Sequence, residues 1–379
     1  MTDLVVFSLE PWDAVWRRNQ YLIDGLLRRD DALRVLFVEP SRDVLYELRS
    51  GHAAHPGAGI RTIDGYDGRL IAFQPTKWLP RAAGPLADML LRSSLGRAWK
   101  KARIEPDVLW VNDPSWAAVV AIHSDVPALY DMTDDWLAAS RSSREHKRIV
   151  ANEQVLMSRC AVVVACSSGL EGSRRGARPD IMLIPNAVDV ARYRRPVPRP
   201  ADLPRGKIAL YVGTLHEDRL DVDLVMQTGR RLAADGATCV LVGPNALSSE
   251  NTRLLNETLG VKVLGPRPYD LVPAYLQHAD ALVVPHVVDE FTDSLDPLKL
   301  YEYQAVGRPI VSTPVAGFRE QKDAMSLVVC DRDSFTDAVR TSVEASMPTI
   351  VVDGVPDWGD RVAAYADVLR RCTSRSLPS

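Results

Sequence analysis

The sequence predicts an α/β protein with two doubly wound, Rossmann-like domains, and three observations lead to this prediction. Short apolar runs typical of strands alternate with longer amphipathic stretches typical of helices along most of the chain. The alternation begins at Leu4 to Ser8 and restarts at Ile208 to Val212, after a segment rich in proline and arginine. The length of 379 residues suits two domains of ordinary size. Strands separated by helices predict parallel sheets that carry helices on both faces.

The proline- and arginine-rich segment supplies the predicted domain boundary. It has no apolar periodicity, so residues 196–206 are expected to form a linker. An N-terminal domain would then span residues 1–195, and a C-terminal domain would span residues 207–355. The remaining stretch, 356–379, has the spacing of a final amphipathic helix.

Composition restricts the class of protein. A hydrophobic content of 46% and a charged content of 25% are typical of globular domains, and the net charge of −3 gives no reason to expect nucleic acid. The five cysteines have no metal-ligand spacing, and we expect no metal site. The N-terminus does not resemble a signal peptide, and no apolar run is long enough to span a bilayer. We therefore expect a cytoplasmic protein, with any membrane contact peripheral and at the inner face.

One predicted helix, Leu86 to Arg103, leaves two interpretations open. Its residues combine apolar side chains with several arginines and lysines. Such a helix could contact an anionic membrane surface, where a lipid-linked acceptor would be found. It could also be an ordinary helix that covers the sheet and has solvated charged ends, and we favour this second interpretation.

The stretch from Asp296 to Thr313, DPLKLYEYQAVGRPIVST, contains the clearest signal of a ligand site. Apolar spacing predicts a helix over Leu298 to Val306, with Pro297 at its first position and Asp296 as its cap. The free N–H groups and the dipole of a helix N-terminus favour phosphate binding. Glu302, about one turn further in, could accept hydrogen bonds from the two hydroxyls of a ribose. The residues alone equally allow a helix packed on a sheet with its charged side chains solvated.

A loop of unusual composition follows the strand predicted at Leu4 to Ser8. It carries Trp12, Asp13, Arg17 and Arg18 at the carboxyl end of that strand, which is the edge where open α/β sheets bind ligands. Two guanidinium groups beside aromatic rings suit a sugar or a phosphate. Packing of the tryptophans under a neighbouring loop is the alternative.

Acidic residues follow two further strands of the first domain. Asp113 comes directly after one strand, and Asp131, Asp134 and Asp135 crowd the end of the next. Like charges this close raise the pKa of at least one carboxyl group, which suits a general base. We expect the base to be Asp134 or Asp135, with Asp13 and Asp113 in reserve. One of the pair could instead cap a following helix.

In the second domain, the turn GTLHEDRLD after Ile208 to Val212 provides candidates for phosphate binding. Gly213 lies where the backbone would approach a phosphate, and Arg219 could reach a pyrophosphate. The turn is not GxGxxG, so a dinucleotide-binding fold is not indicated. His286, after a later strand, could contact the phosphates or cap a loop.

The segment PLKLYEYQAVGRPIVST resembles the nucleotide-binding signature of GT-B glycosyltransferases, especially glycosyltransferase family 4 and its relatives in bacterial surface-polysaccharide synthesis. The resemblance implies that Glu302 holds the nucleotide ribose and that Lys299 and Leu300 belong to the same nucleotide-sugar site. It also implies that the turn at Gly265 holds the nucleobase of the nucleotide. Many retaining members carry a second glutamate eight positions before the first. That position is Ser294 here, which leaves the stereochemical outcome open.

Two shorter segments extend the resemblance in the same order along the chain. Pro185 to Asp189, PNAVD, is similar to the IPNGVD-like turn that closes the first domain in family 4. Asp131 to Trp136, DMTDDW, resembles a turn near the strand end where inverting GT-B enzymes carry an aspartate base. In GT-B proteins the C-terminal helix crosses back to the first domain, and we expect this of residues 356–379.

The resemblance implies two domains that face each other across a cleft. It also implies transfer of a sugar from a nucleotide diphosphate sugar to a hydroxyl acceptor, namely a glycan, a lipid-linked saccharide or a small molecule. GT-B enzymes generally need neither a bound metal nor another cofactor. A nucleotide-sugar epimerase of the same fold is one alternative. A non-catalytic partner subunit is another, which Ser294 favours and Lys299 and Glu302 oppose.

Overall fold

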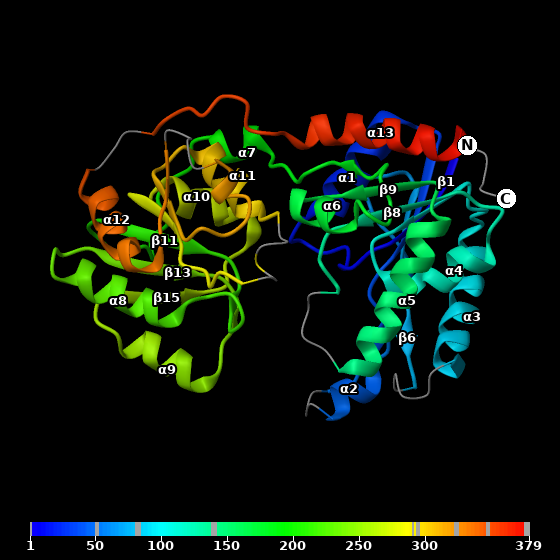
Figure 1. Ribbon diagram of the computed structural model, residues 1–379, viewed down its shortest axis with the longest axis horizontal. Coiled ribbons are helices and arrows are strands. Elements are labelled where there is room, and N and C mark those ends of the chain that lie inside the picture. Colours follow the sequence, from blue (N-terminus) through cyan, green and yellow to red (C-terminus); the bar gives the residue numbers. More distant parts are fainter. Residues whose placement is uncertain are drawn as a thin grey trace. The chain divides into compact units, whose positions relative to one another are not determined.

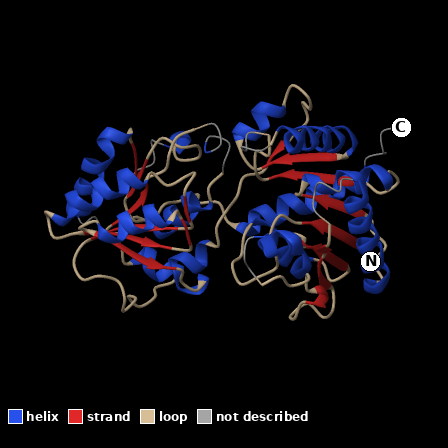
Figure 2. Ribbon diagram, turned by 90° about the horizontal axis from the view of Figure 1, so that it is seen from below, coloured by secondary structure: helices blue, strands red, loops and turns tan. Residues whose placement is uncertain are grey.

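The computed structural model describes residues 2–49, 53–79, 85–137, 142–289, 292, 296–321, 326–345 and 349–374. The chain forms two compact units: Met1–Ile184 together with Trp358–Ser379, and Pro185–Asp357. Both units consist of a mainly parallel sheet and surrounding helices (Figures 1 and 2), so the predicted α/β class is confirmed.

The first unit is built on an eight-stranded sheet in the order β10-β9-β8-β7-β1-β2-β5-β4. Neighbouring strands are parallel except β4, which runs antiparallel to β5 at the edge. Chain order reverses between β1 and β7, which makes the sheet doubly wound and directs ligands to the loops after these two strands. A separate two-stranded ribbon joins β3 and β6. The strands of this unit are β1 (Thr2–Phe7), β2 (Leu33–Val38), β3 (Arg42–Asp43), β4 (Gly59–Thr62), β5 (Leu70–Gln74), β6 (Thr76–Lys77), β7 (Val108–Val111), β8 (Ala128–Met132), β9 (Val162–Ala165) and β10 (Met182–Leu183).

Helices cover both faces of this sheet. Leu4, Val5 and Val6 of β1 are all buried, as expected for a central parallel strand that packs on both sides. One face packs against α3, α4 and α5, and α1 and α13 pack together on the other face. The helices of this unit are α1 (Arg18–Arg29), α2 (Val44–Arg49), α3 (Pro85–Ala102), α4 (Ala117–Ile122), α5 (Ser143–Arg159), α6 (Ser168–Arg174) and α13 (Trp358–Ser374).

A buried polar network, formed by Arg18, Asp131 and Tyr365, fastens the C-terminal helix to this sheet. The Tyr365 hydroxyl accepts a hydrogen bond from Arg18 Nη2 at 2.6 Å and donates one to Asp131 Oδ1 at 2.7 Å. Arg18 also forms an ion pair with Asp131 at 3.3 Å and donates to the carbonyl of Ile184 at 2.7 Å. The Tyr365 ring stacks on Trp110, whose Nε1 donates to Asp131 at 3.2 Å. Buried charges are tolerated because each finds partners of this kind.

The second unit is built on a six-stranded, fully parallel sheet in the order β15-β13-β11-β16-β17-β18. Chain order reverses between β11 and β16, so the predicted binding edge of this unit lies in the loops after these strands. Helices α10 and α11 pack on one face, and α8 and α12 pack on the other. The strands are β11 (Ile208–Val212), β12 (Leu215–His216), β13 (Thr238–Val242), β14 (Asn245–Ala246), β15 (Val261–Gly265), β16 (Ala281–Val284), β17 (Ile310–Ser312) and β18 (Leu327–Val329). The helices are α7 (Val190–Arg194), α8 (Val222–Ala233), α9 (Ser249–Glu257), α10 (Val272–Gln277), α11 (Leu298–Val306) and α12 (Arg332–Ala345).

The unit boundary differs from the boundary predicted from the sequence. Residues 185–206 belong to the second unit, whereas composition suggested a first domain to residue 195 and a linker over 196–206. Side-chain anchoring explains the difference. Asp202 accepts hydrogen bonds from Tyr275 Oη at 2.6 Å and from Arg267 Nη2 at 2.5 Å. The segment lacks helix and strand over 196–206, yet it is fixed to the domain that follows it.

We predict that Tyr365→Phe lowers the free energy of unfolding by about 1.5–3 kcal/mol, because the buried charges of Arg18 and Asp131 each lose a hydrogen-bond partner. Urea unfolding followed by circular dichroism measures this change. Tyr46→Phe is the matched control, since Tyr46 is 70% exposed and should change stability by less than about 0.5 kcal/mol. Equal, small effects of the two substitutions would contradict the importance of the network.

Candidate functional site

The binding edge of the second unit is formed by two loops that are tied to each other. The segment between β11 and α8, which includes β12, carries Arg219, and the loop after β16 carries His286. Backbone bonds join the loops: Asp221 N donates to the Pro285 carbonyl at 2.9 Å, and Val287 N donates to the Arg219 carbonyl at 2.8 Å. The two loops therefore form one fixed surface at the switch point of the sheet.

Gly213 brings the backbone of the first loop against Lys299 at the start of α11. Gly213 has φ of 145°, and a side chain at this position would collide with Lys299 Nζ. Gly243, at the end of the neighbouring strand β13, would likewise collide with the Gly213 carbonyl if it carried a side chain. The Lys299 ammonium lies 5.1 Å from the centre of the Tyr211 ring, within the range of a cation–π contact. The positive φ of Gly213 favours glycine there, and Gly243 is required because a side chain would collide with the Gly213 backbone.

The surroundings of Lys299 are strongly cationic. Burial lowers the pKa of His286 well below its ordinary value, and the charges of Lys299 and Arg219 lower it further. The pKa of His216 is also lowered, by burial first and by Arg219 next. The shifts show that these groups lie close enough to repel an added positive charge. The same field attracts an anion, and a diphosphate suits it.

His286 is held in place rather than left at a loop tip. Its Nε2 lies 3.1 Å from the Tyr211 hydroxyl. The Thr313 hydroxyl accepts a hydrogen bond from His286 N at 3.2 Å and donates to the His286 carbonyl at 2.8 Å. The sequence allowed two roles for His286, a contact with phosphates or a loop cap. Thr313 holds both its backbone N–H and its carbonyl, and its imidazole lies near Lys299 and Arg219.

Glu302 lies one turn inside α11 and contacts a residue that the sequence did not single out. Its Oε1 accepts a hydrogen bond from the Tyr193 hydroxyl at 2.6 Å. Burial raises the pKa of Glu302, while Tyr193, Lys299 and Arg192 lower it, in that order. Tyr193 lies on α7, only a few residues after the PNAVD turn, which is the one signal that could have found it. The tyrosine holds one carboxylate oxygen of Glu302 in a defined position.

The expected cap of α11 is wrong. The N-cap position is Pro297, which has no side-chain cap, and Asp296 lies one residue too early to fill it. Instead, the Asp296 carboxylate accepts from Asn186 N at 2.5 Å and from Tyr301 Oη at 2.7 Å, and its carbonyl accepts from Asn186 Nδ2 at 2.8 Å. The PNAVD turn thus docks on the start of α11, and the two motifs form one structure.

The remaining residues predicted for the nucleotide site lie in different surroundings. Gly265 ends β15, and its carbonyl accepts a hydrogen bond from Gly243 N at 3.0 Å, beside Gly213. Leu300 is fully buried in the core, so its side chain supports the helix. Arg219 lies among the cations near Lys299. Ser294 lies outside the described residues.

At the binding edge of the first unit, Glu10 is the residue that sequence reasoning missed. Burial raises its pKa to about 7; Arg17 lowers the pKa, and Asp134 and Asp13 raise it. Arg17 Nε lies 3.6 Å from Glu10, and Arg17 Nη1 lies 3.7 Å from Asp13. The Glu10 side chain remains 33% exposed, so solvent and ligands can reach it. Its position directly after β1 was the available signal.

Trp12 lies in an aromatic cluster in the same loop. Its ring meets Phe37 edge-on at 5.2 Å and Trp16 at 6.0 Å. Its backbone N donates to Glu39 at 2.6 Å, and Glu39 is paired with Arg61. The Trp12 side chain is half-buried, so packing against its neighbours, the alternative to a ligand contact, accounts for part of its surface.

Three first-unit candidates have structural partners that the sequence did not reveal. Arg18 is buried in the network with Asp131, rather than exposed to a ligand as expected, because α1 packs against the sheet. Asp135 forms a two-point ion pair with Arg174 at 2.9 and 2.5 Å, and Arg174 also binds Glu153. Asp113 accepts from Ser115 N at 2.8 Å and so caps a short 3₁₀ turn.

The helix expected after Trp136 does not begin there. Residues 136 and 137 form a turn in which Asp135 accepts from Leu137 N at 3.0 Å, and α5 begins at Ser143. Asp134 stays half-buried beside Glu10, close enough for their charges to interact.

Two further features of the described ranges concern metals and membranes. No group of three or more histidine, cysteine or acidic residues is arranged there to hold a metal ion. Within the same ranges, every helix is too short or too polar to cross a bilayer.

Known proteins resemble this chain in both sequence and structure. The profile of the family described as glycosyl transferases group 1 matches residues 206–345. A protein of Bacillus subtilis (strain 168) named as a teichuronic acid biosynthesis glycosyltransferase, TuaH, is 23% identical over 241 residues. This match covers 60% of the chain and 59% of TuaH, which is less than two thirds of the relative's length.

Two solved structures have the same fold over nearly their whole length. HepE of Anabaena, solved in complex with UDP, has a TM-score of 0.65 and 18% identity, covering 98% of this chain and 100% of HepE. An α,α-trehalose-phosphate synthase (UDP-forming) from Burkholderia vietnamiensis has a TM-score of 0.65 and 14% identity, covering 100% of both chains. Residues 206–345 therefore match the group 1 glycosyl transferases, and the chain has the GT-B fold.

Proposed function

We propose that this protein transfers a glycosyl group from a nucleoside diphosphate sugar to a hydroxyl group of an acceptor. The observation that carries the proposal is the cationic site at the switch point of the second unit, where Lys299 packs on Gly213 beside Arg219 and His286. Such a site suits a diphosphate. HepE, of the same fold, was solved with UDP, which supports a nucleotide ligand.

In the proposed reaction, the bond between the sugar's anomeric carbon and the diphosphate oxygen breaks, and a bond to the acceptor oxygen forms. The bonding pair leaves with the nucleoside diphosphate, and Lys299 and Arg219 stabilise the added negative charge. Because these side chains supply the positive charge, we propose that transfer needs no metal. Addition of EDTA should therefore leave the rate unchanged.

Glu302 is the proposed ligand of the ribose hydroxyls. Its Oε1 already accepts from Tyr193, so the hydroxyls would approach a carboxylate whose orientation is fixed. The carboxylate makes the same hydrogen bonds before and during the reaction, which assigns Glu302 to binding rather than to chemistry.

An inverting transfer also requires a base for the acceptor proton. We propose that the base belongs to the carboxylate cluster of Glu10, Asp134 and Asp13 in the first unit. Glu10, with its pKa of about 7, takes the proton, and Asp134 raises that pKa. Asp135, paired with Arg174, has a structural role in this scheme.

The names of two relatives support a class of acceptor. TuaH is named for teichuronic acid biosynthesis, and WaaB, of the same fold at a TM-score of 0.60, is a lipopolysaccharide outer core galactosyltransferase. These names support a bacterial surface glycan or its lipid-linked precursor as the acceptor. Trp12, Arg17 and Asp113 are the proposed acceptor contacts at the edge of the first unit.

A panel of nucleotide sugars tests the function directly. Each donor is incubated with and without candidate acceptors, and nucleoside diphosphate release and product mass are measured. Transfer gives a glycosylated acceptor. Conversion of the donor without acceptor would instead identify an epimerase, and donor binding without turnover under any condition would favour a partner subunit.

We predict that Lys299→Met weakens binding of UDP or GDP about 10- to 150-fold, since a charge-assisted hydrogen bond contributes about 1.5–3 kcal/mol. Isothermal titration calorimetry measures the affinity. Lys262→Met is the matched control, because Lys262 is exposed on β15 of the same unit. Equal affinities of the two variants would place the diphosphate elsewhere.

We predict that Glu302→Gln raises KM for the donor about 10- to 100-fold and leaves kcat nearly constant. Tyr193→Phe should raise KM less, because it removes only the group that orients the carboxylate. Steady-state kinetics with varied donor distinguish the cases. A collapsed kcat at unchanged KM would mean that Glu302 takes part in the chemistry.

We predict that kcat/KM rises with pH to a plateau above about pH 7, because Glu10 must lose its proton to act as base. Glu10→Gln should lower turnover about 10²- to 10⁴-fold and remove this limb. Asp134→Asn should shift the limb to lower pH, since it removes a negative charge that raises the Glu10 pKa. A wild-type pH profile in Glu10→Gln would exclude this residue, and a product that keeps the donor's anomeric configuration would exclude the base altogether.

Asp135→Asn separates the structural carboxylate from the catalytic ones. It weakens the ion pair with Arg174, so we expect a loss of about 1.5–3 kcal/mol in the free energy of unfolding with nucleotide affinity unchanged. Urea unfolding and calorimetry on the same sample give both values. A variant that keeps wild-type stability but loses turnover would indicate that Asp135 takes part in catalysis.

A further inference from the structure

The loop of residues 8–17, here called the β1–α1 loop, carries the proposed base Glu10. This loop lies within the described residues and contains neither helix nor strand. Its shape therefore depends on contacts with neighbouring elements. The Pro11 carbonyl accepts a hydrogen bond from Gln20 Nε2 of α1 at 2.9 Å. The next residue, Trp12, is held at both of its backbone polar groups.

Glu39 and Arg61 are the two residues that hold the Trp12 backbone. Glu39, which follows β2 and is 1% exposed, accepts from Trp12 N at 2.6 Å. Arg61 Nη1 and Nη2 each donate to one Glu39 oxygen at 2.6 Å, and Nη2 also donates to the Trp12 carbonyl at 3.3 Å. A planar guanidinium that meets both oxygens of a carboxylate fixes direction as well as distance. Glu39 and Arg61 together are here called the Trp12 clamp.

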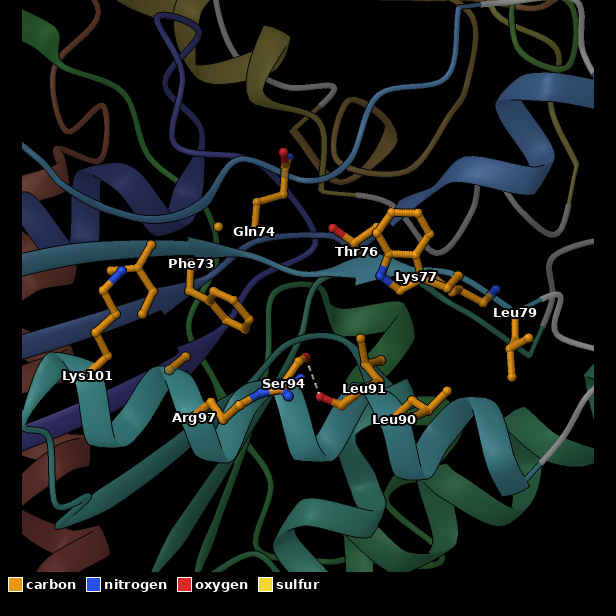
Figure 3. A pocket seen from close by; sticks show the side chains of 14 residues that line it. Phe73, Gln74, Thr76, Lys77, Leu79, Leu90, Leu91, Ser94, Arg97 and Lys101 are labelled. Carbon is orange, nitrogen blue, oxygen red and sulfur yellow. Dashed lines mark hydrogen bonds between the residues drawn. The ribbon is translucent and has the colours of Figure 1, made fainter.

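Strand register explains how Arg61, on the edge strand β4, reaches the loop. Phe37 of β2, Ala72 of β5 and Arg61 lie opposite one another across three neighbouring strands. The small side chain of Ala72 leaves space for Arg61 on this face of the sheet, where the Trp12 ring also meets Phe37. The next residue of β5, Phe73, points to the other face, toward α3 and a pocket of about 370 Å³ (Figure 3). The edge strand thus places Arg61 on the same side of the sheet as the loop.

We propose that Glu39 and Arg61 are positioning residues for glycosyl transfer, because by holding Trp12 they fix the loop that places Glu10 at the binding edge. This inference rests on the proposed function. An ion pair that only stabilised the sheet would need no contact with the loop, whereas both partners here bind the backbone of Trp12, two residues after Glu10. A displacement of about 1 Å can cost about 100-fold in rate, so a base on an irregular loop needs such support.

Asp3→Asn is the matched control for Glu39→Gln, because it changes a similar ion pair at the opposite edge of the same sheet. Asp3 is 4% exposed, is paired with Arg34 at two points and accepts from Glu105 N at 2.9 Å. Both substitutions exchange a buried carboxylate for an amide of nearly the same size, so we expect similar losses of stability. Only Glu39→Gln should change the β1–α1 loop.

Hydrogen exchange followed by mass spectrometry tests the clamp without any substrate. In Glu39→Gln, peptides from the β1–α1 loop should exchange about 10-fold faster, since Trp12 N loses a charged acceptor. Asp3→Asn should match the wild type in these peptides. Arg61→Lys keeps a charge without the two-point contact and should give intermediate rates, and it serves as the test variant if Glu39→Gln does not fold. Equal loop exchange in the clamp variants and in Asp3→Asn overturns the proposal.

Steady-state kinetics test the connection to Glu10. Glu39→Gln should lower kcat about 10- to 100-fold and leave the donor KM unchanged. It should also move the pH limb below pH 7, because a loosened loop buries Glu10 less and burial is the main cause of its raised pKa. The charged neighbours Arg17, Asp13 and Asp134 keep their charges in this variant. Asp3→Asn should change neither kcat nor the limb.

The double variant Glu10→Gln with Glu39→Gln decides whether the clamp acts through Glu10. If it does, the double variant should turn over no more slowly than Glu10→Gln alone. A further loss as large as that of Glu39→Gln in the wild type overturns the proposal. A wild-type chain without turnover on any pair of donor and acceptor would contradict the proposed function instead, and hydrogen exchange would still decide whether Glu39 and Arg61 hold the loop.

Discussion

The buried carboxylate of Asp131 is the constraint around which the first unit is organised. A carboxylate inside a sheet is stable only with close partners, and Asp131 finds them in Arg18, Tyr365 and Trp110. Arg18 in turn holds the carbonyl of Ile184, the last residue before the chain enters the second unit. Tyr365 lies on α13, where the chain has returned. One charged network thus fixes both the exit and the return of the chain within this unit.

The second unit solves a different physical problem, namely holding several cationic groups close together around Lys299. Gly213 and Gly243 let two strand ends pack so tightly that Lys299 lies against bare backbone. The neighbouring imidazole of His286 has a lowered pKa, so it adds a hydrogen-bonding group at neutral pH without adding charge. A site of this kind is stabilised by an incoming anion, because the anion offsets repulsion that the fold already contains.

The sequence predicted the parts of this structure that depend on local pattern. Apolar periodicity located β1, β11 and α11. Partners distant in the chain escaped prediction. Nothing near Arg18 indicates that it would be buried against Asp131, and nothing near Asp135 indicates Arg174. The cap at Asp296 failed for the same reason, since Asn186 and Tyr301 compete for its carboxylate. Composition also predicted a linker at 196–206, although this segment is anchored to the second unit. A segment rich in proline and arginine is flexible only where its residues have no fixed partners.

The proposed binding edges of the two units carry different charged groups, cations near Lys299 in the second and carboxylates near Glu10 in the first, and this difference fits the two halves of the proposed glycosyl transfer. Departure of a diphosphate creates negative charge, which Lys299 and Arg219 would stabilise. Attack by a hydroxyl releases a proton, which a carboxylate such as Glu10 would accept only if its pKa lay near the working pH. The burial that raises the Glu10 pKa would be a cost in a purely structural carboxylate, and Asp131 and Asp135 avoid such a cost through ion pairs. Glu10 instead keeps its main cationic neighbour, Arg17, at 3.6 Å and a third of its surface open. A carboxyl group whose pKa lies near 7 at a proposed binding edge is more consistent with a catalytic role than with a packing role.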